Sequence, residues 1–335
     1  MNAMSGDPAA QRLLLEPRSR RGKTLSLIVP MYNEQEVLGV FFDRVFAVLE
    51  GLGVDLEIVC IDDGSRDATL PLLVARARTD PRVRVVALAR NFGKESAMTA
   101  GLDTATGDIV VPIDADLQDP PEVIAQFIDL WEQGYDVVYG VRRSRTSDGF
   151  VKRSTAEAFY KVFNRVSDME IPPNTGDFRL MDREAVEALK LLPERNRFMK
   201  GLFAWVGFRH IGVPYDRPER AAGQTSWRYM RLFTFALDGI TSFSTLPLRM
   251  WTSIGLTVAV GALLWALGII VRTLIFGVDM PGYASMMVVM LFGIALQMIA
   301  FGVLGEYAGR LYQEAKARPV YLVRRVYSFK DGKAL

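Results

Sequence analysis

Three carboxylates in the N-terminal half of this chain follow apolar runs, at positions where the strands of a parallel sheet would end. Asp62 and Asp63 close one run, and Asp114 closes another. Like charges at neighbouring strand ends repel one another unless a cation or hydrogen-bond donors offset them. Asp114 and Asp116, two residues apart, could both bind one hard cation and leave positions open for phosphate oxygens. This spacing predicts a Mg or Mn site that holds a diphosphate.

The counts of cysteine and histidine restrict the metal chemistry that the chain could support. One Cys and one His cannot form a disulfide within the chain, or a zinc site built from four Cys or from paired Cys and His. A bound metal would need oxygen ligands, which favours Mg or Mn. No GxGxxG follows the first apolar run and no GxxxxGKS or GxxxxGKT occurs, so dinucleotide-binding and P-loop proteins are disfavoured.

The elements that would position these carboxylates alternate along the first two thirds of the chain. Short apolar, β-branched runs occupy residues 25–30, 56–62, 83–89, 108–113 and 136–139. Amphipathic helical patterns occupy residues 35–51, 67–79, 94–105, 120–133, 152–167 and 182–192. This alternation predicts an α/β domain with a mostly parallel sheet covered on both faces. Ligands of such sheets bind beyond the carboxyl ends of the strands.

Further polar residues follow the same predicted strands. They lie in segments 30–34, 62–67, 89–94 and 114–121, and they supply carboxylates, amides and one lysine, Lys94. Turn and helix-capping roles account for Ser65, Asp67 and Asp119. Those roles leave the three strand-end aspartates unexplained, which favours a binding site at this edge.

A cluster of cations follows the fifth apolar run. Arg142 and Arg143 come directly after it, and Arg153 lies at the start of the next predicted helix. Guanidinium groups bind phosphate through paired hydrogen bonds, so the cluster predicts a second phosphate site near the same edge. Arg145 and Lys152 fit a solvated surface as well, because most charge runs face water.

The apolar residues are concentrated in two stretches near the C-terminus. Hydrophobic residues make up 50% of the chain and the mean hydropathy is +0.15, which is high for a soluble enzyme. Residues 251–271 and 281–305 carry no charge, and each stretch could cross a hydrocarbon core about 30 Å thick as a helix. We predict two transmembrane helices. Two buried helices of a soluble core are the alternative, but these would normally keep a polar face.

The charges around these stretches predict an orientation and a set of boundaries. Basic residues lie on both outer flanks and are sparse in the link 272–280, so both chain ends are expected in the cytoplasm. The net charge of +2 gives no global field to attract nucleic acid. The predicted parts are a disordered tail (1–23), the α/β domain (24–222), helices at the membrane interface (223–249), a transmembrane hairpin (250–306) and a cytoplasmic tail (307–335). Strand character at 319–326 would let this last tail pair with a neighbouring subunit or dock on its own domain.

Four segments in order carry a resemblance to a known family. LSLIVPMYNE, IDDGSRD, RNFGKESAMTAG and DADLQDPPE resemble the inverting glycosyltransferases of family two, which have a GT-A fold. With YGVRRSRTSDGF, TGDFRLMDR and two terminal membrane helices, the chain is similar to polyprenyl-phosphate glycosyltransferases of the bactoprenol glucosyltransferase type, which are related to dolichol-phosphate mannose synthase. The resemblance covers residues 24 to 325.

The resemblance implies roles for particular residues. The nucleotide-sugar would contact Pro30, Tyr32, Glu34, Asp62, Asp63, Lys94, Asp114 and Gln118, with Asp63 at the base edge and Asp114 and Asp116 on Mg or Mn. For Lys94, an exposed position at the start of a helix is the alternative. Arg142, Arg143 and Arg153 would bind the acceptor phosphate.

Asp177, in the segment TGDFR, resembles the candidate catalytic base of the family. A lipid monophosphate has a second pKa of about 6, so its oxygen is already mostly anionic near neutral pH. We therefore expect Asp177 to orient the acceptor or to complete the metal shell, with Arg179 on phosphate.

The resemblance implies transfer of one hexose, with glucose from UDP-glucose favoured, to polyprenyl (undecaprenyl) phosphate at the cytoplasmic face of the inner membrane. It also implies a homo-oligomer, a tetramer, that serves surface glycans such as lipopolysaccharide. The alternatives are mannose from GDP-mannose, aminoarabinose or N-acetylglucosamine from UDP, a nucleotidyl- or sugar-phosphate transferase, and a non-catalytic membrane scaffold.

Overall fold

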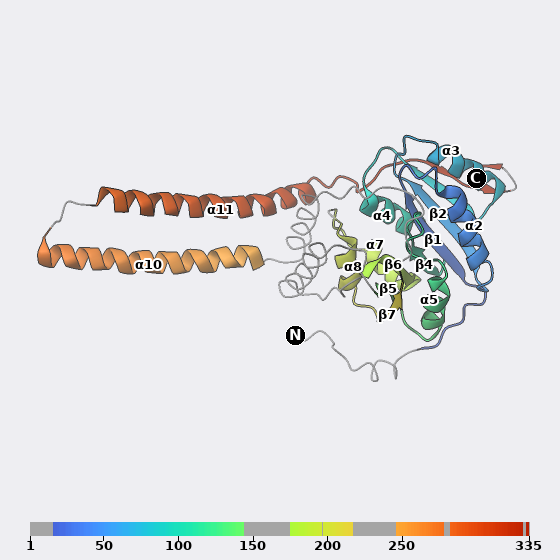
Figure 1. The fold of residues 1–335 in the computed structure, drawn as a ribbon, viewed down its shortest axis with the longest axis horizontal. Helices are drawn as coiled ribbons and strands as arrows, with labels where there is room; N and C mark the ends of the chain where they lie inside the picture. The colour runs from blue at the N-terminus through green and yellow to red at the C-terminus, as the bar shows by residue number, and fades with distance from the viewer. Residues whose placement is uncertain are drawn as a thin grey trace.

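The computed structural model describes residues 16–143, 175–195, 197–216, 246–277, 282–330 and 333–334. An α/β domain holds most of them, and a long helical hairpin extends away from that domain (Figure 1). The predicted helix 152–167 and Arg153 lie outside the described residues.

The α/β domain is built on an eight-stranded sheet in the order β7-β5-β6-β4-β1-β2-β3-β8. The strands are β1 (Thr24–Met31), β2 (Asp55–Asp62), β3 (Val83–Leu88), β4 (Ile109–Pro112), β5 (Val137–Arg142), β6 (Thr175–Asp182), β7 (His210–Tyr215) and β8 (Val323–Tyr327). β4, β1, β2 and β3 are parallel neighbours, as predicted. β6 is antiparallel to both β4 and β5, and β8 is antiparallel to β3.

Helices cover both faces of the sheet, because its central strands are apolar on both sides. One core joins the sheet to α2 (Leu38–Leu49), α3 (Thr69–Thr79) and α5 (Val123–Glu132). The other joins it to α4 (Lys94–Thr104), α7 (Arg183–Lys190) and α8 (Met199–Trp205). At Gly101 a Cβ would clash with Ile28 and Ile61, so glycine lets α4 lie close against β1 and β2. This contact holds the carboxyl half of α4 against the sheet.

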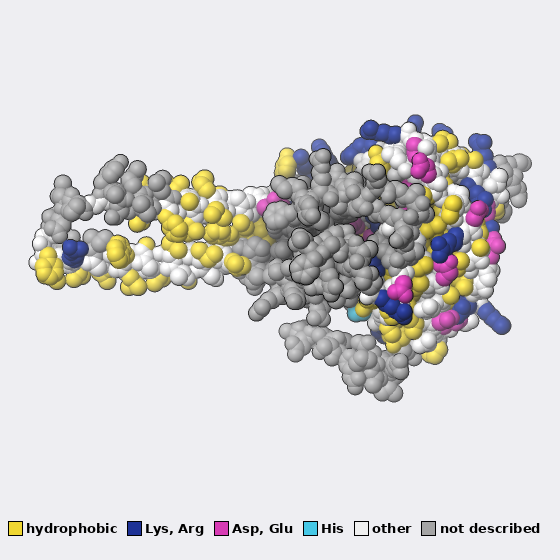
Figure 2. Space-filling view, in the orientation of Figure 1, with side chains coloured by type: hydrophobic (Ala, Val, Ile, Leu, Met, Phe, Trp, Pro, Cys, Tyr) yellow, Lys and Arg dark blue, Asp and Glu magenta, His cyan; other side chains and the backbone are white. Residues whose placement is uncertain are grey.

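The helical hairpin consists of α10 (Leu246–Phe276) and α11 (Tyr283–Ala315), which lie side by side (Figure 1). Figure 2 shows hydrophobic side chains along both helices. In the described part of the chain, one stretch, Phe292–Ala315, is long and apolar enough to cross a membrane, and Ser253–Ala262 is a shorter apolar stretch. By length and composition the described residues thus offer one candidate span, and the prediction of two spans is not confirmed. α10 begins before residue 250 and α11 ends after residue 306, so the hairpin is longer than predicted.

The chain after α11 returns to the α/β domain. β8 pairs with β3 at the edge of the sheet, and the amide of Ala89 donates to the carbonyl of Leu322 at 2.8 Å. The hydroxyl of Tyr321 donates to Asp103 at 2.7 Å. A short hairpin of β9 (Phe329–Lys330) and β10 (Lys333–Ala334) follows, and Phe329 is buried. Of the two expected fates of this tail, the structure has the tail docked on its own domain.

Residues 16–23 correct the prediction of a disordered tail up to residue 23. The guanidinium of Arg18 pairs with Asp136 and lies 3.3 Å from Asp182, and the guanidinium of Arg20 pairs with Asp129 and Glu132. Because these cations find fixed carboxylates beside α5 and β5, the segment is ordered without an apolar pattern of its own. The expected tail is thus wrong from residue 16 onward.

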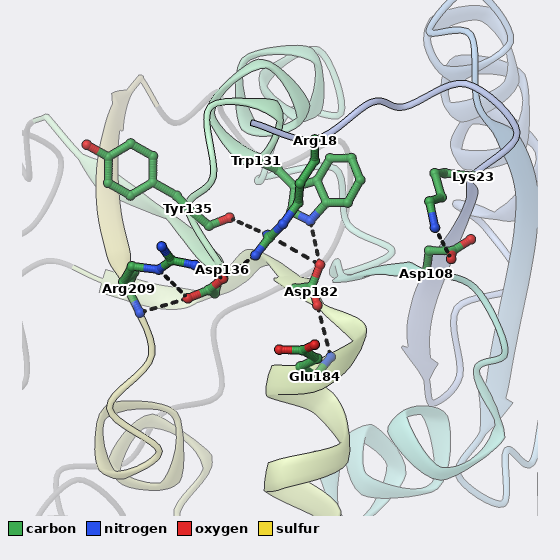
Figure 3. Close-up of polar contacts among 9 residues, drawn as sticks. All are labelled: Arg18, Lys23, Asp108, Trp131, Tyr135, Asp136, Asp182, Glu184 and Arg209. Carbon is green, nitrogen blue, oxygen red and sulfur yellow. Dashed lines mark hydrogen bonds and ion pairs between the residues drawn. The ribbon is translucent and has the colours of Figure 1, made fainter. Parts of the chain in front are cut away.

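These contacts belong to an amino-end cluster, made of Arg18, Trp131, Asp136, Asp182 and Arg209, at the edge of the sheet opposite the strand-end aspartates (Figure 3). Asp136 accepts from Arg209 at 3.1 Å, and Asp182 accepts from the indole of Trp131 at 2.8 Å. The second oxygen of Asp182 caps α7 by accepting from the amide of Glu184. Every carboxylate oxygen of this cluster therefore has a donor.

Candidate active site

The loops after β1 and β2 are bound to each other. The amide of Asn33 donates to Ser65 at 3.0 Å, and the amide of Arg66 donates to the side chain of Asn33 at 2.8 Å. Gly64 has φ +70°, and a Cβ there would lie 2.6 Å from the backbone of Arg90, so glycine lets the loop after β2 lie close against the segment after β3. This network holds the segment of Pro30, Tyr32 and Glu34 at the carboxyl edge, and the ring of Tyr32 is 40% exposed. Their contact with a nucleotide stays a prediction.

Asp63 has a structural role that its sequence position did not reveal. Its two carboxylate oxygens accept from the amides of Phe92 and Gly93 at 2.7 and 2.9 Å. Burial raises the pKa of Asp63, and these backbone bonds offset part of the rise. Asp63 thereby fixes the loop that starts α4, in addition to any contact with a base edge. Neighbouring Asp62 accepts from the amide of Ser65 at 3.3 Å.

The segment after β4 turns sharply and presents oxygen atoms. Asp114 follows the strand, Leu117 has φ +55°, and Asp116 accepts from the amide of Gln118 at 3.1 Å. The amide oxygen of Gln118 is buried without a hydrogen-bond partner. Two carboxylates and one orphaned amide oxygen suit a hard divalent cation. No group of three or more His, Cys, Asp or Glu side chains that could hold a metal occurs among the described residues.

Lys94 joins two carboxylates that come from different strands. Its ammonium lies 2.7 Å from Asp114 and 2.9 Å from Asp177. Desolvation lowers the pKa of Lys94, but the charges of Asp177 and Asp114 outweigh it, so the pKa lies above its ordinary value. Lys94 is therefore a paired cation inside the site. Lys94 is also the first residue of α4 and its side chain is 45% exposed, so both its pairing with carboxylates and the exposed position at the start of a helix hold, and its contact with a ligand stays a prediction.

Asp177 is ionised in this setting although it is largely buried. Burial raises its pKa, but the ammonium groups of Lys94 and Lys200 and the guanidinium of Arg179 have the larger, opposite effect. The net result is a pKa well below the usual range of an aspartate. A carboxylate with so low a pKa is a weak base. One of its oxygens, Oδ1, is buried without a hydrogen-bond partner. The side chain can thus accept from a ligand more readily than it can remove a proton.

Arg179 lies beside Asp177 and is almost fully buried. Its guanidinium stacks 3.8 Å from the ring centre of Phe203 on α8 and donates to the carbonyl of Gly176 at 2.8 Å. Burial lowers its pKa to about 10, so it remains a cation at neutral pH. Its Nε has no partner. This donor is available to an anionic ligand.

Two of the predicted acceptor arginines, Arg142 and Arg143, have partners within the protein, and Arg153 lies outside the described residues. Arg142 donates to the hydroxyl of Tyr215 at 3.3 Å and lies 3.7 Å from Asp119, which also accepts from Tyr215. Arg143 is more exposed and lies 3.6 Å from Asp216. Asp119 therefore does more than shape a turn, because it anchors Arg142. The binding of phosphate by these arginines stays a prediction.

Sequence reasoning missed Glu95 and Lys200. Glu95, the second residue of α4, has one buried oxygen without a partner. Burial and the charge of Asp177 raise its pKa to about 8, against the opposing effects of Lys94 and Lys200. Lys200 lies at the start of α8, distant in sequence from Glu95 and Asp177, the two carboxyl groups that its charge affects. The motif RNFGKE contains Glu95, but nothing in that motif alone indicates that its carboxyl group is buried.

Several known proteins are similar to this chain in sequence. Residues 26–190 match the model of glycosyl transferase family 2. An uncharacterised glycosyltransferase of Synechocystis sp. is 53% identical over 91% of this chain and 96% of its own length. A prophage bactoprenol glucosyl transferase homologue of Escherichia coli is 51% identical over 90% of this chain and 99% of its own length. A bactoprenol glucosyl transferase of Shigella phage SfX is 51% identical over 90% of this chain and 98% of its own length.

Among solved structures, glucosyl-3-phosphoglycerate synthase from Mycobacterium tuberculosis, in complex with Mn2+, UDP and glucosyl-3-phosphoglycerate, is 23% identical. The match covers 66% of this chain and 78% of that one, with a TM-score of 0.46. The chain belongs to glycosyltransferase family 2. It is therefore a transferase, and the carboxyl edge of the sheet is its candidate active site.

Proposed function

We propose that this enzyme transfers glucose from UDP-glucose to a polyprenyl phosphate and inverts the anomeric configuration. The observation that carries the proposal is the bridge from Lys94 to Asp114 and Asp177, which gathers two carboxylates and a cation at the carboxyl edge of the sheet. Relatives that are 50 to 51% identical over about nine tenths of the chain are named bactoprenol glucosyl transferases. Those names support glucose and a polyprenyl acceptor.

The site residues fit a divalent cation, Mg or Mn. Asp114, Asp116 and the orphaned oxygen of Gln118 would hold it. When bound, such a cation neutralises the charge that develops on a leaving diphosphate. Pro30, Tyr32, Glu34, Asp62 and Asp63 would contact the nucleotide.

The reaction we assign is a single in-line displacement. An oxygen of the acceptor phosphate forms a bond to the anomeric carbon as the bond from that carbon to UDP breaks, and the electron pair leaves with UDP. Asp177 would orient the acceptor as a carboxylate, since a phosphate monoester has a second pKa of about 6 and needs little deprotonation. Arg179 would donate its free Nε to that phosphate.

The same proposal places the enzyme on a membrane. α10 and α11 would both cross the inner membrane as a multi-pass anchor with the α/β domain and both chain ends in the cytoplasm. The apolar stretch Phe292–Ala315 and the exposed apolar side chains of α10, such as Leu264 and Trp265, support this. A homotetramer and a role in surface glycans such as lipopolysaccharide complete the proposal.

The test is release of nucleotide by detergent-purified full-length protein. UDP-glucose, other UDP-sugars and GDP-mannose are each supplied with and without polyprenyl phosphate, Mg or Mn. We expect UDP from UDP-glucose only when lipid and metal are both present. Asp116→Asn should abolish that release, and Asp43→Asn, an exposed acid on α2, should not.

Other outcomes would contradict the proposal in different ways. Release of GDP from GDP-mannose would change the sugar, and release of pyrophosphate would indicate a nucleotidyl transferase. A lack of lipid-dependent turnover with every donor would favour a scaffold.

A further inference from the structure

Buried polar atoms without a hydrogen-bond partner gather at the candidate active site. Four of them are Gln118 Oε1, Asp177 Oδ1, Arg179 Nε and Glu95 Oε2. Burying a polar atom without a partner costs about 1–3 kcal/mol, so each such atom in a native protein calls for an explanation. In the proposed function, a metal ion would be the partner of Gln118 Oε1, and the acceptor would be the partner of Asp177 Oδ1 and Arg179 Nε. That function gives no partner to Glu95 Oε2.

Glu95 is held firmly at the centre of the site. It follows Gly93, whose amide Asp63 accepts, and Lys94, whose ammonium joins Asp114 and Asp177. Its carboxyl group interacts with the charges of Asp177 and Lys200 and with the backbone amide of Met199. Glu95 thus lies near the amino end of α4, the strand that carries Asp177, and the start of α8.

Roles within the fold do not use the buried oxygen. An acidic residue in the first turn of a helix is favourable, but that effect operates on exposed side chains and does not require burial. α4 has no side-chain cap, so Glu95 does not complete a capping box. In the described part of the chain neither Lys94 nor Lys200 forms an ion pair with Glu95. Oε2 is left for a ligand.

We propose that Glu95 Oε2 forms a hydrogen bond with a hydroxyl group of the sugar being transferred, which makes Glu95 a specificity-determining residue for the donor. The inference rests on the proposed function. A phosphate oxygen acts as an acceptor, so it suits Glu95 less well than a hydroxyl group, which can donate to the carboxyl oxygen or accept from it. A sugar hydroxyl suits a carboxyl group in either protonation state. A site built around such a bond rejects a donor that lacks the hydroxyl, because the buried oxygen then stays unpaired.

The experiment measures binding of UDP, UDP-glucose and a set of UDP-deoxyglucoses, without acceptor, to full-length wild type and to Glu95→Gln. We expect the substitution to weaken binding of UDP-glucose about tenfold, as for the loss of one hydrogen bond, and to leave binding of UDP unchanged. One deoxy donor, which lacks the partner hydroxyl, should bind both proteins equally. Glu50→Gln, at the carboxyl end of α2 where Glu50 pairs with Arg82, is the control and should change neither binding constant.

Equal weakening of UDP and UDP-glucose, or the same loss for every deoxy donor, would overturn the inference and leave Glu95 a structural role. Because no acceptor is present, failure of lipid-dependent turnover would not affect this result. If UDP bound to neither protein, the proposed function itself would fall, and the inference with it.

Discussion

Two polar clusters among the described residues of this domain differ in one respect. In the amino-end cluster each carboxylate oxygen of Asp136 and Asp182 accepts from a donor (Figure 3). At the carboxyl edge, buried atoms of Glu95, Asp177 and Arg179 have no partner. Both clusters contain aspartates beside arginines, so residue type does not separate them. Completeness of hydrogen bonding does.

A closed cluster contributes to folding, and an open one keeps unpaired groups for a ligand. Loss of a group from the first should therefore reduce stability and spare activity, and loss from the second should do the reverse. Four substitutions would test this contrast, with expected effects that run from largest to smallest.

Asp114→Asn should reduce glucosyl transfer about 1,000-fold, because it removes a charge from the proposed metal site and from the Lys94 bridge. The melting temperature should fall little. Steady-state kinetics and a thermal melt on the same preparation check both expectations. Retained activity in this variant would contradict the assignment of Asp114 to the metal site.

Asp177→Asn should lower kcat/KM about 100-fold by the same factor at every pH from about 6 to 9. The reason is that Asp177, whose pKa lies well below its ordinary value, is a carboxylate throughout this range. Parallel pH–rate profiles of wild type and variant are the measurement. Recovery of the variant in proportion to hydroxide would indicate instead that Asp177 is a true base.

Asp136→Asn should destabilise the domain by about 2–3 kcal/mol, since it breaks the pairs with Arg18 and Arg209. Burial raises the pKa of Asp136, but the bonds from these arginines lower it below its ordinary 3.8. Its stabilisation is therefore full above pH 3.8 and is lost as pH falls through the folded-state pKa. Chemical denaturation should show a deficit at pH 7 that shrinks toward pH 3, with UDP binding unchanged at 25 °C.

Glu95→Gln should change stability least, by about 1 kcal/mol, and with the opposite pH dependence. The pKa of Glu95 is about 8 in the folded protein against an ordinary 4.5. The folded state holds this proton more tightly, so the contribution to stability is full below pH 4.5 and declines as pH rises toward 8. In thermal melts from pH 5 to pH 9, the melting temperature of wild type should therefore fall relative to that of the variant. A constant difference across that range would show that Glu95 does not titrate there.

The residues at the carboxyl edge of the sheet could largely be predicted from the sequence. The cluster at the amino end could not. Apolar runs located β1 to β5 to within a few residues, and the rule for parallel sheets placed Asp62, Asp63 and Asp114 together. The helices α2, α3, α4, α5 and α7 also followed their patterns. These features depend on local periodicity, which a sequence displays directly.

What could not be predicted depends on contacts between distant segments. Arg18 meets Asp136 across more than a hundred residues, and no periodic pattern marks residues 16–23. The same holds for Lys94 and Asp177, which meet because β6 runs antiparallel beside β4. Asp63 was assigned to a ligand from its strand-end position, and its bonds to the loop before α4 require that loop's actual path.

The return of the chain from α11 into β8 has a mechanical consequence. Only residues 316–322 separate the end of the helix from a strand bonded to β3, and Arg195 donates to Glu314 and to the carbonyl of Arg318 near the junction. A change in the tilt of α11 would therefore have to strain the β8–β3 pairing, and β3 is in turn paired with β2, whose carboxyl end leads into Asp62 and Asp63. We expect these backbone hydrogen bonds to limit how far the hairpin can tilt relative to the site.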